Sequence, residues 1–512
     1  MIDFMKKWWK VGILLGFLSL IYFVVRTYHL TEMPIFTDEA IYIRWSQIAK
    51  QDANWRFISL TDGKQPMYVW IAMILMKFIS DPLMAGRMVS VLAGLVSMIG
   101  LFFLGREIFK SVRVGVLSSI LYLIYPFALV YDRMAMYDTL VGTFTIWSLF
   151  IAFLLIRTVR LDVALIFGLV VGGGMLTKTN AFFSLLFPIF GLLFFDFTGK
   201  NVKYRLFKLA GLALVSTVLA FLCYSILRLS PFFHIISDKN NLFVYTLEEW
   251  WWLPNKYFSL WSNFRGLWDW FWNYMTIPWV VLVPIGLFIQ KKHFREKVFL
   301  IFIFLVPFIY LTFFGKTIYP RFVLFMTLSL IPLVAYTLLE LKDRIKNKKL
   351  GYLVFALFFV WPLYMDYFVL FNLKNAPLPR SDLRQYLLDW PAGGGVKESV
   401  EFFEKEASRG PIYLATQGTF GLMPFAYEIY LVQNPNIKIV GYWPLGDTVS
   451  QELLDQSKKM PTYIVFYQPC PGCSKAGLAP IGWERNLKIV QRYTRGLATG
   501  PRYLTVYQII SP

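Results

Sequence analysis

The sequence has little charge and few of the residues that bind metals or nucleotides. Only 16% of its 512 residues are charged, whereas a soluble domain usually carries about a quarter. It has three histidines without metal-ligand spacing and three cysteines, too few for a four-cysteine zinc site within one chain. No Walker or dinucleotide fingerprint is present, and Gly172–Gly174 lies inside an apolar run, where glycines favour close helix packing. The sequence therefore gives no support for the use of ATP or a nucleotide sugar.

Apolar residues make up 57% of the chain and aromatic residues 19%. Tryptophan and tyrosine are enriched at membrane–water interfaces. The net charge of +20 does not indicate nucleic-acid binding, because the positive residues lie in short blocks between long apolar runs. Such blocks are the orientation signals of membrane proteins. We therefore predict a multi-pass protein of the plasma membrane.

Eleven apolar segments approach the length of about 20 residues that a membrane span needs. The first is interpreted as an uncleaved span, because no small-residue cleavage site follows Val25. A twelfth segment, 66–80, has only 15 residues. The predicted spans are 11–28, 83–104, 112–131, 139–156, 161–177, 180–196, 206–228, 274–290, 298–314, 318–340 and 350–371.

Six basic blocks orient these spans. With eleven crossings, all six lie on the cytoplasmic side, as the positive-inside rule requires, and the C-terminus lies outside. If 66–80 also crossed, every later block would move to the wrong side, so we predict that it lies in the interface or re-enters. The blocks are residues 6–10, 106–113, 157–160, 200–208, 291–297 and 342–349.

The sequence predicts two domains. Residues 1–371 form the transmembrane domain, with a first external loop at 29–82 containing interfacial helices and an aromatic external loop at 229–273. Residues 372–512 form an extracytoplasmic domain, in which strand-like runs alternate with helical patterns, as in a small α/β fold. The strands are predicted at 411–416, 437–442, 462–467 and 503–509, and the helices at 396–408 and 451–459. On the external side, Cys470 and Cys473 are expected to form a local disulfide.

A second set of charged residues lies at the predicted outer ends of the spans. Burial at a membrane boundary is costly unless such groups pair or bind a ligand. Carboxylates can act as general bases, and lysine with arginine can hold a phosphate. An apolar groove beside such a pocket would suit a lipid phosphate. The set comprises Asp38, Glu39, Lys64, Asp132, Arg133, Asp138, Lys178, Lys316 and Arg321.

These features also have structural interpretations. Thr37 is a candidate helix N-cap, after which Asp38 and Glu39 would favour the helix dipole. Arg133 and Asp138 would form a structural pair, and Lys64 and Lys178 would be interfacial anchors. The aromatic segment Glu248–Tyr274 is interpreted equally well as a lid that stacks on sugar or as an interfacial belt.

Six motifs occur in order along residues 10–340: PIFTDEAIYIRWSQIA, GKQPMYVW, AGRMVSVLAG, YDRMAMYDTL, GGGMLTKTNAF and YPRFVLFMTLSLIPL. Their order resembles that of the C-type (GT-C) membrane glycosyltransferases. The nearest likeness is to family 39, which includes protein O-mannosyltransferases and the aminoarabinose transferases that modify lipid A. The resemblance implies a GT-C fold of about 11–13 transmembrane helices.

The sequence departs from the family pattern at four places. Gln65 replaces a proline of the Lys-Pro-Pro motif, which predicts a looser turn. Ile41 stands where the aminoarabinose branch has a basic residue, which argues against that substrate. Asn180 stands near the usual glycine of Thr-Lys-Gly, and Phe322 replaces a tyrosine, which removes a hydroxyl from the pocket.

By this resemblance, the enzyme would move a monosaccharide from a polyprenyl-phosphate donor to a hydroxyl of a lipid, glycan or protein, with inversion, at the extracytoplasmic face. Asp38 would be the general base, Glu39 would orient it or hold the sugar, and Asp138 would bind the acceptor or shape the site. The substrate-binding residues would be Tyr42 in the first-loop motif and, stabilising the leaving phosphate, Lys64, Arg133, Lys178 and Arg321.

No cofactor is required by the sequence and no metal site is predicted, although the resemblance extends to oligosaccharyltransferases that hold a divalent cation on such acids. The alternative function is a transporter or flippase of lipid-linked substrates. Transporters tend to show internal repeats and polar groups near the bilayer midplane. Here no repeat is visible and the polar groups lie at one face.

Overall fold

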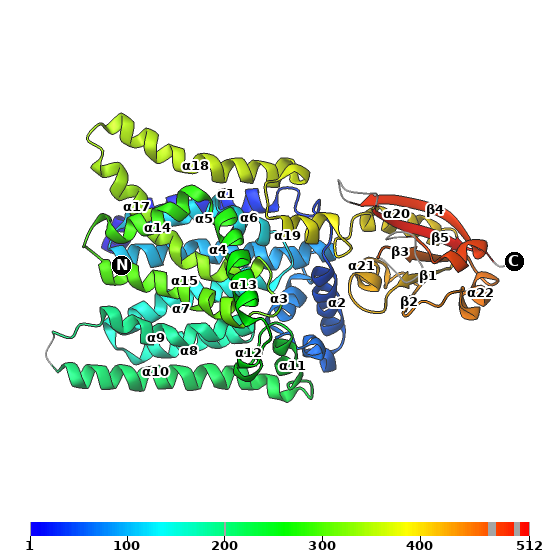
Figure 1. Cartoon of the computed structure of the whole chain (residues 1–512), viewed down its shortest axis with the longest axis horizontal. Helices are drawn as coiled ribbons and strands as arrows, with labels where there is room; N and C mark the ends of the chain where they lie inside the picture. Colours follow the sequence, from blue (N-terminus) through cyan, green and yellow to red (C-terminus); the bar gives the residue numbers. More distant parts are fainter. Residues whose placement is uncertain (1, 199–200, 469–477, 496–501, 511–512) are drawn as a thin grey trace. The chain divides into compact units, whose positions relative to one another are not determined.

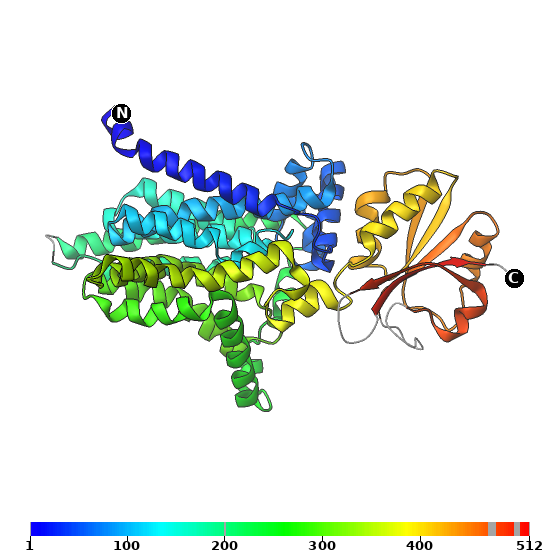
Figure 2. The same cartoon turned by 90° about the horizontal axis from the view of Figure 1, so that it is seen from above.

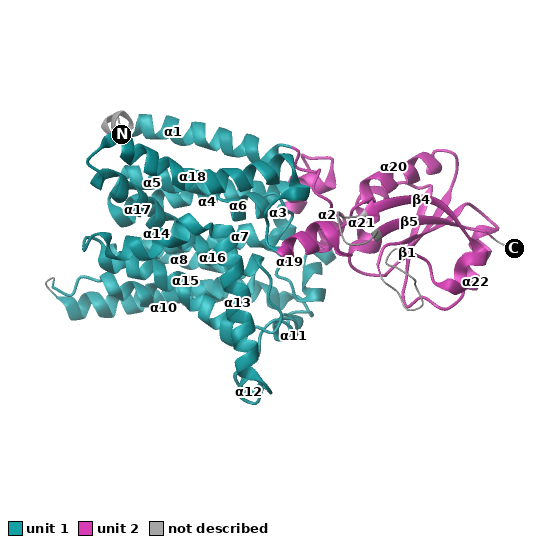
Figure 3. Ribbon diagram, turned by 45° about the horizontal axis from the view of Figure 1, so that its top comes forward, with its two compact units in different colours: residues 1–28, 54–71, 87–379 teal, residues 29–53, 72–86, 380–512 magenta. Residues whose placement is uncertain are grey.

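The computed structural model describes residues 2–198, 201–468, 478–495 and 502–510. The chain divides into two compact units (Figure 3). Unit 1 contains residues 1–28, 54–71 and 87–379, and unit 2 contains residues 29–53, 72–86 and 380–512. The division near residue 380 lies close to the boundary predicted at 371. Two segments of the predicted transmembrane domain group instead with the C-terminal tail.

Seven stretches of helix within the described residues are long and apolar enough to cross a membrane. They lie in α1 (Ile2–Thr27), α4 (Pro82–Phe109), α7 (Tyr137–Thr158), α10 with η5 (Val202–Leu229), α15 (Phe294–Phe314), α16 to α17 (Arg321–Arg344) and α18 (Lys348–Phe371). Each coincides with one of the predicted spans.

The other four predicted spans are shorter or bent. Three are short apolar stretches: α5 (Val112–Leu123), α8 (Leu161–Met175) and the run η3, α9, η4 (Thr179–Phe194). The fourth is α14 (Ile277–Ile289), which meets α13 (Lys256–Met275) at a bend of 98°. In Figure 2, α13 accordingly leaves the long helices of unit 1 at a steep angle (green).

The disputed segment 66–80 contains α3 (Met67–Leu75), which has nine residues. At 1.5 Å per residue it is about 14 Å long, less than half of a hydrocarbon core of about 30 Å. This length agrees with the prediction that the segment does not cross. The remaining short helices before the tail are α6 (Pro126–Tyr131), α11 (Ile235–Asn241), α12 (Leu247–Trp251) and the 3-10 turns η1 (Ala53–Trp55), η2 (Ile58–Asp62) and η7 (Leu373–Asn375).

Small residues let α8 and α10 pack side by side, as Figure 1 shows. A Cβ atom on Gly168 would lie 2.7 Å from the Ser216 carbonyl oxygen, and one on Gly172 would lie 2.7 Å from Cys223 Cβ. The Ser216 hydroxyl also donates to the carbonyl of Ala164 at 2.8 Å. The glycines of α8 therefore serve helix packing, as predicted.

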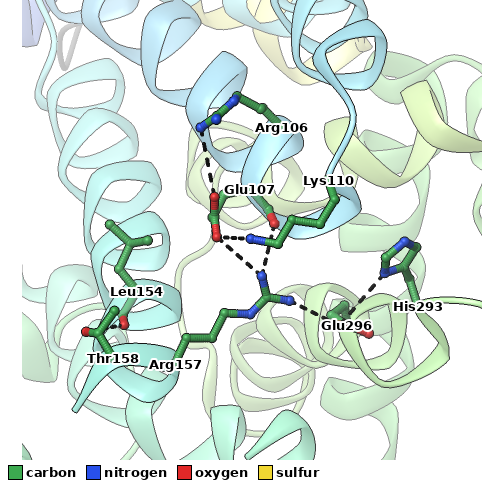
Figure 4. Close-up of polar contacts among 8 residues, drawn as sticks. All are labelled: Arg106, Glu107, Lys110, Leu154, Arg157, Thr158, His293 and Glu296. Atoms are coloured by element: carbon green, nitrogen blue, oxygen red, sulfur yellow. Dashed lines mark hydrogen bonds and ion pairs between the residues drawn. The ribbon is translucent and has the colours of Figure 1, made fainter. Parts of the chain in front are cut away.

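Ion pairs join three of the predicted cytoplasmic blocks (Figure 4). Arg157 Nη1 lies 3.3 Å from Glu107 Oε1, and Arg157 Nη2 lies 3.4 Å from Glu296. Lys110 pairs with the same Glu107 carboxylate. A fourth block joins through Arg113, whose guanidinium lies 2.7 Å from an Asp343 oxygen. These blocks share one side of unit 1, and the assignment of that side to the cytoplasm stays a prediction.

The tail in unit 2 forms a five-stranded sheet in the order β2-β1-β3-β5-β4. β1 pairs in parallel with β2 and β3, and β5 is antiparallel to β3 and β4. The strands are β1 (Ile412–Gln417), β2 (Ile437–Tyr442), β3 (Thr462–Phe466), β4 (Leu487–Arg495) and β5 (Arg502–Ile509). The helices are α19 (Arg380–Leu383), α20 (Val396–Ala407), α21 (Leu422–Leu431) and α22 (Gln451–Ser457), with a π turn at 384–388 and a 3-10 turn at 481–486.

Alternate residues of β3 bury opposite faces of this sheet. The Tyr463 ring packs against Phe403 of α20, whereas Ile464 joins the core that contains Leu453 of α22. Four of the five strands were predicted. β4 was missed, because Lys488, Arg492 and Arg495 interrupt its apolar pattern, as edge strands tolerate.

Unit 2 also contains α2 (Thr37–Gln51), the first helix of the loop predicted to be external. Arg44 Nε lies 2.5 Å from a Glu428 carboxylate oxygen on α21, and the Gln47 amide donates to the Ile429 carbonyl at 2.7 Å. The backbone N–H of Thr37 donates to the Pro391 carbonyl at 3.0 Å. The helix that carries Asp38 is thus packed into the α/β unit.

Candidate functional site

Three of the predicted phosphate-binding cations gather around two aromatic rings of unit 1. The rings of Phe243 and Phe322 meet edge to face, with centroids 5.8 Å apart. Lys64 Nζ lies 5.3 Å from the centre of the Phe243 ring. Lys178 Nζ lies 4.7 Å, and the Arg321 guanidinium carbon 5.9 Å, from the centre of Phe322. Aromatic faces attract cations, so the pair holds three positive groups in one place.

Asp138 carries the negative charge of this cluster. Its Oδ1 lies 2.6 Å from Lys178 Nζ, and its side chain is only 4% exposed, against 19% for that of Lys178. Asp138 lies in the first turn of α7, where the helix dipole favours a carboxylate. The structure therefore pairs Asp138 with Lys178, whereas the sequence suggested Arg133, which is buried in the turn between α6 and α7.

Two tight turns present the lysines. Gly63, at φ +64°, ends η2, and the backbone N–H of Lys64 donates to the Ser59 carbonyl at 2.9 Å. A Cβ atom on Gly63 would lie 2.5 Å from Lys239 Cβ, so only glycine fits there. Lys178 follows the end of α8, and its N–H donates to the Gly174 carbonyl at 3.0 Å.

Gln65 makes a contact that was not predicted from the sequence. Its side chain is buried, at 3% exposure, and its amide donates to Thr179 Oγ1 at 3.0 Å. A proline at this position has no side-chain donor and makes no such bond. The replacement therefore joins the turns that carry Lys64 and Lys178.

Arg321 begins α16 and is buried, with its guanidinium 4.8 Å from the centre of the Tyr319 ring. The segment before it holds Phe243 in place. The backbone N–H of Lys316 donates to the Phe243 carbonyl at 2.8 Å, and Val244 pairs with Gly315 in an isolated bridge. Lys316 is itself occupied, because its ammonium donates to a Glu249 carboxylate oxygen at 2.7 Å.

The acids of the first loop lie at the start of α2 in unit 2. Asp38 is partly exposed, and the Tyr42 hydroxyl donates to its Oδ2 at 3.3 Å. Glu39 is fully buried, and its Oε2 accepts from the backbone N–H of Phe36 at 2.9 Å. Phe36, not Thr37, is therefore the N-cap residue. This cap uses one carboxylate oxygen of Glu39, and the role of Glu39 in holding the sugar stays a prediction.

Asp132 belongs to a separate structural network. Its fully buried carboxylate accepts from Arg26 Nε at 3.1 Å, from the Tyr22 hydroxyl at 2.8 Å and from the Tyr122 hydroxyl at 3.1 Å. The network ties α1 to α5 and to the turn after α6. Among the described residues, no group of three or more His, Cys, Asp or Glu is arranged to hold a metal ion. Cys470 and Cys473 lie outside the described residues.

A small apolar cleft, with an accessible volume of about 10 Å³, lies in unit 1 on the elements that carry these charges. It involves α7, which carries Asp138, η3, which follows Lys178, and α16, which begins at Arg321. Its polar lining groups are two hydroxyls. The cleft is lined by Thr145, Phe183, Ser184, Phe187, Phe190, Ile303, Val306, Pro307 and Phe325.

Residues 63–224 match a family model described as dolichyl-phosphate-mannose-protein mannosyltransferase. This range contains Lys64, Asp138 and Lys178. A search of curated proteins finds no match.

Two solved structures share the fold. ArnT from Cupriavidus metallidurans in the apo state is 13% identical, with a TM-score of 0.58 over 97% of both chains. The same protein bound to undecaprenyl phosphate is 14% identical, with a TM-score of 0.55 over 98% of both chains. The likeness extends through the tail as well as the helices.

Proposed function

We propose that this chain, which belongs by its fold to the GT-C superfamily of membrane glycosyltransferases, transfers a monosaccharide from a polyprenyl-phosphate carrier to a hydroxyl group. The acceptor is a lipid, glycan or protein at the extracytoplasmic face, and the transfer inverts the anomeric carbon. The observation that carries this proposal is the cluster of Lys64, Lys178 and Arg321 around Phe243 and Phe322.

The cluster suits a phosphate that is joined to a lipid. Two ammonium groups and a guanidinium supply charge-assisted hydrogen bonds, which are about twice as strong as neutral ones. Asp138 offsets one of the three positive charges through its ion pair with Lys178. Apolar side chains line a small cleft on the same elements, α7, η3 and α16, so the cluster adjoins apolar surroundings of the kind that a lipid tail would contact.

The names of the matched proteins support this ligand class. The family description names a dolichyl phosphate, and one ArnT structure is described as bound to undecaprenyl phosphate. Both are polyisoprenoid phosphates. The sugar and the acceptor differ between such proteins, so neither is carried over to this chain.

In the proposed reaction, the acceptor oxygen attacks C1 of the sugar from the face opposite the phosphate. The C1–O bond to the phosphate breaks, and its electron pair passes to the phosphate oxygen. Lys64, Lys178 and Arg321 stabilise that negative charge, and Arg133 is proposed to assist. Asp38 takes the proton of the acceptor hydroxyl, while the Tyr42 hydroxyl holds its carboxylate in place. The residues invoked here require no cofactor.

The test is transfer of radiolabelled sugar from a panel of polyprenyl-phosphate monosaccharides by purified protein in lipid, with native membrane extract as acceptor. Asp38→Asn is expected to lower transfer by about 100-fold or more, because positioned bases contribute 10²–10⁴-fold. Asp162→Asn is the matched control, since that aspartate is exposed, pairs with Arg160 and lies two residues after the predicted cytoplasmic block 157–160. Transfer that persists at near wild-type rate in Asp38→Asn rules out Asp38 as the base. No transfer from any donor favours the flippase alternative.

A further inference from the structure

We propose that Gln65 is a positioning residue that sets the spacing of Lys64 and Lys178 through a hydrogen-bonded chain of Gln65, Thr179 and Asn240. The proposal rests on the proposed function, because it assigns both lysines to the donor phosphate. It concerns residues that touch neither sugar nor phosphate in that mechanism.

The chain of bonds runs in one direction. The Gln65 amide donates to Thr179 Oγ1 at 3.0 Å, and the Thr179 hydroxyl donates to the Asn240 side-chain oxygen at 3.1 Å. Gln65 is buried at 3% exposure, whereas Thr179 and Asn240 are half-buried. Loss of the Thr179 hydroxyl would leave the buried Gln65 amide without this acceptor, which is costly because little solvent reaches that amide.

The position of these hydrogen bonds makes them a spacer between the two lysines. Gln65 directly follows Lys64, and Thr179 directly follows Lys178, so a bond between their side chains fixes the distance between the two backbones. A lysine side chain has a flexible four-carbon stem, and its reach is set by where its backbone is held. Fixing both backbones therefore restricts the two ammonium groups to one phosphate-sized target.

Helix α11 carries Asn240, the last residue of the hydrogen-bonded series. Asn240 lies on α11, and its neighbour Lys239 pairs with Asp62 at 2.6 Å, just before the Lys64 turn. Phe243, which follows α11, carries the ring beneath Lys64. The same short segment thus contacts both sides of the Lys64 turn and, through Thr179, the Lys178 turn.

The two turns are also joined by backbone, which makes the test practicable. The N–H of Met67 donates to the Leu176 carbonyl at 3.0 Å. This bond does not depend on the Gln65 side chain, so Gln65→Leu and Thr179→Val are expected to keep the fold and the approach of the two turns. They would remove only the side-chain bond that restricts residues 64 and 178 to one spacing. Thr179→Ser keeps the hydroxyl and is the conservative control.

The measurement compares the affinity of the full-length protein in detergent for undecaprenyl phosphate and for undecaprenol, which lacks the phosphate. Wild type is expected to prefer the phosphate. Gln65→Leu and Thr179→Val are each expected to lower the affinity for undecaprenyl phosphate about tenfold, the equivalent of one weakened charged contact. The affinity for undecaprenol is expected to stay unchanged, whereas damaged packing would lower both.

A double variant separates a shared bond from two independent effects. If Gln65 and Thr179 act through one bond, the double variant loses no more than either single variant. Ser119→Ala removes an unrelated buried bond of 3.0 Å to the Met98 carbonyl and is expected to leave both affinities unchanged. Thr179→Ser is expected to match wild type.

The outcomes distinguish the two proposals. Equal wild-type affinity for undecaprenyl phosphate and undecaprenol would overturn the proposed function itself. A wild-type preference for the phosphate that survives in both Gln65→Leu and Thr179→Val would overturn the positioning role alone.

Discussion

Replacing Lys178 with methionine tests the electrostatics of the cluster without reference to any substrate. The substitution keeps much of the apolar stem of the side chain and removes the ammonium that lies 2.6 Å from Asp138. The Asp138 side chain is 4% exposed, so its carboxylate would then be buried without the Lys178 ammonium. We expect Lys178→Met to destabilise the protein by about 3 kcal/mol, the lower end of the cost of breaking a buried pair.

An ion pair of equal length gives the comparison. Lys239 Nζ lies 2.6 Å from Asp62 Oδ1, but these side chains are 23% and 27% exposed. Solvent screens such a pair, so we expect Lys239→Met to cost about 1 kcal/mol or less. The difference of about 2 kcal/mol therefore comes from burial at the same distance.

The assay is the thermal denaturation midpoint of purified full-length variants in one detergent. The double variant Lys178→Met, Asp138→Asn removes both charges and is expected to be more stable than Lys178→Met alone, because no uncompensated carboxylate remains. Equal losses in Lys178→Met and Lys239→Met, or additive losses in the double variant, would refute the argument from burial.

Two further predictions follow from the site and the topology. Arg321→Ala is expected to raise the KM for the lipid-phosphate donor about tenfold, the equivalent of about 1.4 kcal/mol, and to leave the KM for the acceptor unchanged. Steady-state kinetics in which each substrate is varied in turn would measure both KM values. An unchanged donor KM would count against a role of Arg321 in phosphate binding. A reporter fused after residue 512 is expected to be extracytoplasmic in topology assays, and a cytoplasmic signal would contradict eleven crossings.

The spans and most of the tail could be predicted from the sequence because their signals are local. A run of apolar residues shows its length directly, so all eleven segments correspond to helical stretches of the structure. Strand β2 was predicted with its observed bounds, Ile437–Tyr442, since its apolar pattern is bounded by turns. α21 was missed, because nothing in its sequence separates a short helix from the loop that leads into it.

The partners within the site could not be predicted, because they depend on which turns meet. Asp138 and Lys178 are 40 positions apart, and the sequence offered Arg133 as the nearer partner. Phe243 gave no signal, since aromatic residues are common throughout that loop. Gln65 was noticed only as a departure from a motif, and its meaning depends on Thr179, 114 positions away.

The assignment of α2 to unit 2 changes what the C-terminal tail is. Thr37, Arg44 and Gln47 each bond to residues between Pro391 and Ile429, so the proposed base stands on a helix whose supporting surface comes from the other end of the chain. The tail is therefore part of the structure that supports Asp38 and not an independent domain. Exchanging it for the tail of another protein would remove the residues that α2 bonds to. Chimeras are therefore better designed with α2 and the tail from the same parent protein.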